Sequence, residues 1–140
     1  MKVDRQIIFK FLIHVVSPMV LGVLVYHFMT DREILLNRVM ENLTGGKGNI
    51  GISAPDWVKY NLPDGLWPYS FASAILIIHD CRIERKNIPW VLLAVCFPLA
   101  LEYGQKFGIL QGTYDPLDVI WSLGGSFVSI VILTLKPQSL

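Results

Sequence analysis

The chain has 140 residues, of which 53% are hydrophobic and 16% are charged, and its formal net charge at pH 7 is +1. A soluble domain carries charged side chains at about 25% of its positions, so this composition excludes an ordinary water-soluble protein. The apolar residues come in long blocks rather than in alternating or strictly helical periods, which predicts helices that span a membrane.

Four spans are predicted in chain order. The first covers 11–30, and we expect it to be retained because no small-x-small cleavage motif follows it. The second covers 62–79, but its apolar part, 66–79, is short, so it spans only if the chain enters the membrane near Tyr60 or if neighbouring protein covers a short helix. The third and fourth cover 88–107 and 118–135, close to the roughly 20 residues of a bilayer-crossing helix. We therefore expect an all-α fold, an integral membrane four-helix bundle that forms a single domain.

The segment 31–61, between the first two spans, is the longest part outside them. Thr30 and Glu33 fit a capping box before a short amphipathic run, which predicts a short interfacial helix on the membrane surface. Pro55 stands early in a second short interfacial helix. Four aromatic residues nearby predict a belt at the membrane interface: Trp57, Tyr60, Trp67 and Tyr69.

Basic residues in the short flanks predict the orientation. They gather before the first span, between the second and third, and after the fourth: Lys2, Arg5, Lys10, Arg82, Arg85, Lys86 and Lys136. The other two connections are acidic or balanced. Because basic flanks stay on the cytoplasmic side, we expect a multi-pass protein of the cell membrane with both termini in the cytoplasm and 31–61 outside.

Polar residues converge at the outer level of these spans. Glu102 lies 14 residues beyond Ile88, which is about 21 Å along a helix that begins at the inner face. Asp118 opens the fourth span at the same level, followed by a stripe of small residues that permits close helix packing. The stripe consists of Ser122, Gly125 and Ser129, and the predicted pocket consists of Asp64, Glu102, Gln105, Asp115, Asp118, Ser122 and His27.

A family resemblance lies in the same region. The chain reads E-x-x-Q, then G-x-x-D-x-x-D, then G, with Glu102, Gln105, Gly112, Asp115, Asp118 and Gly125 at these positions. This pattern resembles the signature of the VanZ-like family, small bacterial membrane proteins named for a factor that gives low-level teicoplanin resistance. The resemblance implies an inner-membrane protein that acts at the outer face. Thr113 stands where the family usually has arginine and Ser122 where it has asparagine, so no role of that arginine is carried over.

Four carboxylates at one membrane depth cannot all stay ionised in a partly desolvated pocket, so a proton or a cation is expected among them. The VanZ-like resemblance implies that this pocket binds or modifies a cell-envelope molecule and is linked to glycopeptide or envelope-stress tolerance. Alternatively, Glu102 is the catalytic group of an enzyme acting on a lipid or lipid-linked headgroup, with a divalent cation held by Glu102, Asp115 and Asp118. A structural subunit of a membrane complex is a third reading.

A purely structural role for the carboxylates also stays open, with Asp115 and Asp118 as turn and cap residues. We expect His14 to be packed or hydrogen-bonded. A transporter is the poorest reading, because the middles of the spans offer few polar residues: Ser17, Ser73, Ser126 and Ser129. The expected partner is a membrane lipid or a lipid-linked cell-wall component and not a nucleic acid, and a homo-oligomer is possible.

Overall fold

The computed structural model describes residues 5–29, 39, 42–43, 45 and 54–135. The helices are α1 (Arg5–Phe11), a π-helical turn η1 (Leu12–Val16), α2 (Ser17–Met29), a second π-helical turn η2 (Trp57–Asn61), α4 (Leu62–Ile78), α5 (Ile88–Lys106) and α6 (Pro116–Leu135). No strand occurs in these described residues, so the prediction of an all-α fold is confirmed. The surface helix predicted after Thr30 falls outside the described residues except at a few isolated positions.

Two π-helical turns end beside a proline. The turn η1 joins α1 to α2 in one continuous helix, and η2 directly precedes α4. In η1 the amide of Ser17 bonds the carbonyl of Leu12, and Pro18 follows. In η2 the amide of Leu62 bonds the carbonyl of Trp57, and a second proline follows. A proline inside an α-helix loses a hydrogen bond and collides with the carbonyl four residues back, so helices change geometry at such points. The second predicted surface helix is therefore continuous with α4.

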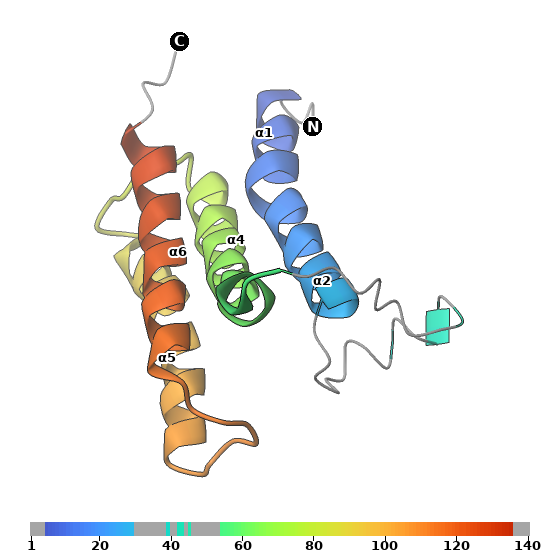
Figure 1. Ribbon diagram of the computed structural model, residues 1–140. Coiled ribbons are helices and arrows are strands. Elements are labelled where there is room, and N and C mark those ends of the chain that lie inside the picture. Colours follow the sequence, from blue (N-terminus) through green and yellow to red (C-terminus); the bar gives the residue numbers. More distant parts are fainter. Residues whose placement is uncertain (1–4, 30–38, 40–41, 44, 46–53, 136–140) are drawn as a thin grey trace.

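The helix α4 is the centre of the fold. It packs against α2 on one side and against α5 and α6 on the other (Figure 1). Its buried residues are Pro63, Gly65, Pro68, Ser70, Ala72, Ser73, Leu76 and Ile77. This position supplies cover from neighbouring protein, one of the two conditions under which the short apolar segment 66–79 was expected to span.

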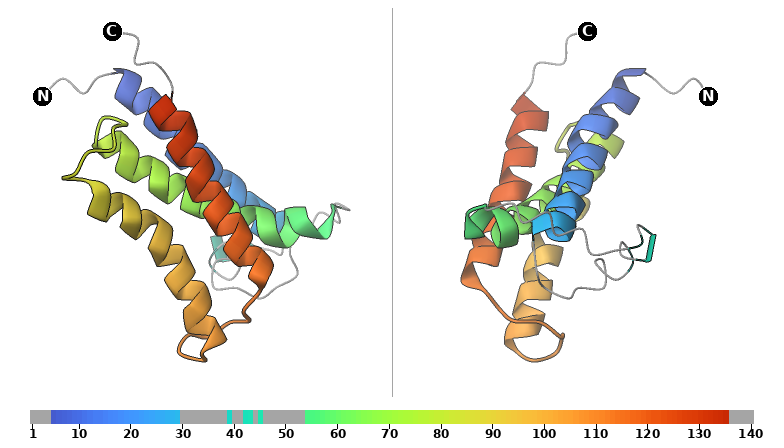
Figure 2. Two further views of the ribbon diagram at one scale, coloured as in Figure 1. Left: turned by 90° about the vertical axis from the view of Figure 1, so that its left-hand side faces the viewer. Right: turned by 45° about the vertical axis from the view of Figure 1, so that its right-hand side comes forward.

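The first and last described residues, Arg5 and Leu135, lie at the same end of the molecule (Figures 1 and 2). The α4–α5 turn also lies at this end, and the α5–α6 turn lies at the opposite end, which we call the distal end. The chain therefore traverses the molecule an even number of times.

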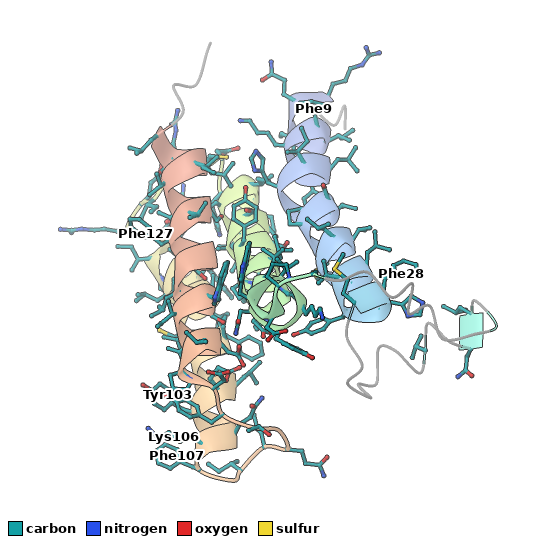
Figure 3. All side chains as sticks on the ribbon, in the orientation of Figure 1. Phe9, Phe28, Tyr103, Lys106, Phe107 and Phe127 are labelled. Atoms are coloured by element: carbon teal, nitrogen blue, oxygen red, sulfur yellow. The ribbon has the colours of Figure 1, made fainter. Side chains whose placement is uncertain are left out.

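The surface of α6 shows what medium surrounds the helices. Its buried residues are mostly polar: Asp118, Ser122, Ser126, Ser129 and Leu133. Large apolar side chains are exposed instead, and Phe127, 66% exposed, projects away from the other helices (Figure 3). Water favours the opposite arrangement, and extensive exposed apolar surface marks contact with lipid or protein. Three of the described helical segments are long and apolar enough to cross a membrane: Arg5–Met29, Ile88–Lys106 and Pro116–Leu135.

Two glycines set the distance between α4 and α6. A Cβ built on Gly125 would overlap the carbonyl oxygen of Gly65 and lie 2.9 Å from its carbonyl carbon. A Cβ on Gly65 would in turn lie 3.2 Å from the ring of Trp121. Glycine permits such backbone contact because it has no side chain, as the small-residue stripe predicted.

Candidate functional site

Two carboxylates meet near the distal end, where α4 and α6 begin. The hydroxyl of Tyr26 on α2 donates to Asp64 Oδ1 at 2.7 Å. The side-chain amide of Asn61 donates to Asp118 Oδ1 at 3.1 Å. The two carboxyl groups interact electrostatically, so a proton held between them would relieve their mutual repulsion.

The local structure explains this placement. Asp64 directly precedes Gly65, so the glycine contact between α4 and α6 brings its backbone against α6, where Ser122 Oγ donates to its carbonyl oxygen at 3.1 Å. The turn η2 ends at Asn61 and aims its side chain at Asp118. On the same turn Trp57 stacks on Trp121 of α6, with ring centroids 5.8 Å apart and planes 8° apart.

Glu102 joins the group from α5. Its carboxyl group interacts electrostatically with that of Asp118 and next with that of Asp115, and it also acts weakly on that of Asp64. Its Oε2 atom is buried and accepts no hydrogen bond from the described residues. We call Asp64, Glu102 and Asp118 the distal acidic cluster. The ion pair formed by Lys86 Nζ and Glu84 Oε2, at 2.8 Å, belongs to the α4–α5 turn at the opposite end.

Asp115 has a different role from the cluster. Its Oδ1 atom accepts the amide of Leu117 at 2.9 Å, directly after Pro116 opens α6. That is the geometry of a helix N-cap followed by proline in the first turn. The capping role considered for both aspartates therefore falls to Asp115, because Asp118 is nine-tenths buried and faces Asn61.

Gln105 lies outside the cluster, against Gly112 of the α5–α6 turn. A Cβ built on Gly112 would lie 2.6 Å from Gln105 Cδ, and Gly112 has φ +143°, a conformation that favours glycine. Nearby, the ammonium of Lys106 lies 4.9 Å from the ring centroid of Tyr114 (Figure 3 labels Lys106). The polar residues predicted as one pocket thus divide into a buried cluster and a turn.

His27 is the predicted residue that stands apart. It is buried, and its ring packs edge-on against Phe28 with centroids 4.8 Å apart. Within the described residues, the hydrogen bonds of the cluster do not include it. The neighbouring Tyr26 takes the role expected of His27, and the sequence analysis missed it. A signal existed: Gly22, one turn earlier, packs against Pro63 and Leu66 of α4 and marks the face of α2 that meets α4.

In the part of the chain that the structure describes, no three side chains of His, Cys, Asp and Glu are placed to hold a metal ion. The divalent cation considered at Glu102, Asp115 and Asp118 thus gains no support. Comparisons with protein families, curated proteins and solved structures found no match for this chain. The VanZ-like resemblance stays a prediction.

Proposed function

We propose that the chain is an integral membrane protein that crosses the bilayer four times, with α4 as the central crossing and both termini in the cytoplasm. The three apolar helices, the outward-facing apolar side chains of α6 and the even number of traverses support this topology. The basic residues of the α4–α5 turn, Arg82, Arg85 and Lys86, lie at the same end as Arg5, as the positive-inside rule requires. The distal acidic cluster then faces outward.

At this cluster the protein binds a cell-envelope molecule, either a membrane lipid or a lipid-linked cell-wall component, that presents an ammonium group. The supporting observation is Glu102 Oε2, a buried acceptor without a hydrogen-bond donor beside two further carboxylates. Leaving a buried acceptor unsatisfied costs about 1–3 kcal/mol, and more for a charged group. An ammonium group supplies both the missing donor and the missing positive charge. The VanZ-like resemblance implies the same outer-face location and a link to glycopeptide tolerance.

A lipid-binding experiment tests this proposal. Purified protein in detergent is mixed with phosphatidylethanolamine, which carries an ammonium group, or with phosphatidylglycerol, which lacks one. We expect the first lipid to raise the melting temperature more than the second. Glu102→Gln should abolish this difference, whereas Glu84→Gln, an exposed carboxylate at the opposite end, should retain it. Equal effects of the two lipids on the wild-type protein would refute ammonium recognition.

The link to the cell envelope has its own test. In bacteria that express the wild-type chain, we expect a higher tolerance to a lipophilic glycopeptide than in cells without it. Glu102→Gln should remove this tolerance, and Glu84→Gln should keep it at equal protein levels. Tolerance that survives Glu102→Gln would separate the phenotype from the cluster.

A further inference from the structure

A second group of polar side chains lies in the middle of the molecule, nearer the end where α1 begins. The hydroxyl groups of Ser73 on α4 and Ser129 on α6 share a hydrogen bond of 2.8 Å, and both residues are fully buried. His14 Nδ1 on η1 shares a hydrogen bond of 2.6 Å with the hydroxyl of Tyr69 on α4. Ser73 lies one turn beyond Tyr69 on the same helix, so the two hydroxyl groups share a face of α4. These contacts connect α4 to α6 and to the continuous helix formed by α1, η1 and α2.

Serines on α6 extend from this group towards Asp118 of the distal acidic cluster, which lies one turn before Ser122 on the same helix. Ser122, Ser126 and Ser129 lie on one buried face of the helix, and Ser122 bonds the backbone of Asp64. Ser129 is 11 residues beyond Asp118, which is about 16 Å along the helix axis. That length is about half of the 30 Å hydrocarbon core of a bilayer. We call Ser122, Ser126, Ser129, Ser73, Tyr69 and His14 the polar track.

Ser126 is the position that points to an occupant. It is 1% exposed, and its hydroxyl oxygen has no hydrogen-bond partner among the described residues. Its neighbours on the same helix face are Ser122 and Ser129, one turn to either side. A buried hydroxyl without a partner is unfavourable, and a water molecule held between hydroxyl groups is the usual solution.

We propose that the polar track is a proton relay between the distal acidic cluster and His14, with a water molecule bound at Ser126. Carboxyl groups at one end and an imidazole at the other take up and release protons, and such chains inside a membrane are typical of proton pathways. This inference rests on the proposed membrane topology but not on lipid binding. Beyond His14, the next titratable group on the same continuous helix towards Arg5 is Lys10, one turn away.

The transfer is balanced at each step. Each hydroxyl or water oxygen forms one new O–H bond with the incoming proton and breaks another when it passes its own proton to the next acceptor. The net result is a carboxylate in the distal acidic cluster and an imidazolium at His14. Uptake of one proton by the cluster from its own side, loss of one proton from His14 on the other side, and rotation of the hydroxyl groups restore the starting arrangement. Across a membrane the displaced charge needs a compensating ion.

A transporter was the poorest reading of the sequence, because four serines were too few for a polar path. In the structure, three of these four serines lie together between two helices. Ser17 is exposed, but Ser73, Ser126 and Ser129 are all buried on the helices α4 and α6, which pack against each other. Together with Ser122, the hydroxyl of Tyr69 and a water molecule at Ser126, they complete the proposed path.

Proton flux into liposomes tests the relay. The full chain is reconstituted with a pH-sensitive dye inside, and a potassium gradient with valinomycin provides the compensating ion and the driving potential. We expect acidification faster than in protein-free liposomes. Tyr69→Phe should reduce the rate to the protein-free level, because it keeps the ring and removes the hydroxyl between Ser73 and His14. Thr134→Val is the control, since that hydroxyl bonds the carbonyl of Ile130 at 2.6 Å and lies off the track.

A second variant guards against a folding defect. Ser126→Ala removes one unpartnered hydroxyl and should also abolish the flux, while its melting temperature stays at the wild-type value. Wild-type flux no faster than in protein-free liposomes, or full flux in Tyr69→Phe, would overturn the relay. Lipid binding at Glu102 would be unaffected by that result, so failure of the relay and failure of the proposed binding function can be told apart.

Discussion

The contact between α4 and α6 can be tested with two neighbouring glycines on one helix. A Cβ added at Gly125 would overlap the carbonyl oxygen of Gly65 and approach two further backbone atoms of that residue, its carbonyl carbon at 2.9 Å and its Cα at 3.3 Å. Backbone atoms cannot rotate away as a flexible side chain can. A Cβ added at Gly124 would meet no atom within 4 Å. Gly125→Ala and Gly124→Ala therefore make the same chemical change, but only Gly125→Ala disturbs the contact with Gly65.

The expected energies follow from that difference. Replacing glycine by alanine inside a helix is favourable by about 0.8–1 kcal/mol, so Gly124→Ala should leave the free energy of unfolding unchanged or raise it. Gly125→Ala has the same intrinsic gain but forces the helices apart, which costs about 1–3 kcal/mol for overpacking. Weakening the bonds of Asn61 to Asp118 and of Ser73 to Ser129 adds about 0.5–1.5 kcal/mol each. The two variants should differ by about 2–6 kcal/mol.

The measurement is reversible unfolding of the purified protein in mixed micelles, as the denaturing detergent fraction increases. Both variants are compared with the wild-type chain at one protein concentration. A midpoint that falls for Gly125→Ala and holds for Gly124→Ala would support the contact. Equal midpoints for the two variants would show that α4 and α6 do not meet at these residues.

Three further predictions concern topology, capping and charge. With the native cysteines replaced by alanine, an impermeant thiol reagent should label Thr113→Cys in intact cells but not Arg85→Cys, and the reverse pattern would invert the orientation. Asp115→Ala should lower the free energy of unfolding by about 0.5–2 kcal/mol through loss of the α6 cap, whereas Asp115→Asn should lose little in the same micelle assay. Asp118→Asn should match or exceed wild-type stability, and Asp118→Ala should lose about 1–3 kcal/mol because its amide partner loses an acceptor. An Asp118→Asn protein as unstable as Asp118→Ala would show that the cluster needs the carboxylate charge.

Much of the helical framework was predictable because each apolar block is bounded by clear signals. The third predicted span, 88–107, agrees with α5 to within one residue. The fourth was placed two residues late, at 118, because Asp118 was read as the first residue of the helix. Proline is favoured in the first helical turn, which makes the preceding residue the cap. That rule, applied to Pro116, would have identified Asp115.

The polar track was not predictable, because a serine in an apolar helix has two outcomes that look the same in sequence. It can bond the carbonyl four residues back on its own helix, as Ser70 does with Leu66 at 2.8 Å. It can instead bond another helix, as Ser73 does with Ser129. Which outcome occurs depends on how α4 rotates against α6, and a contact between residues far apart in the chain, Gly65 and Gly125, sets that rotation.

The residues that hold α4 to α6 are also residues of the proposed relay, and the two tasks make different demands. Between helices in a bilayer there is little hydrophobic driving force, so close packing and polar bonds hold them together. A relay, in contrast, needs hydroxyl groups that change partners in every cycle, including the buried pair Ser73 and Ser129. Bonds of this kind between membrane helices contribute only about 0.6 kcal/mol on average, close to the thermal energy. The hydroxyl groups can therefore turn without separating the helices, because the backbone contact between Gly65 and Gly125 does not depend on them.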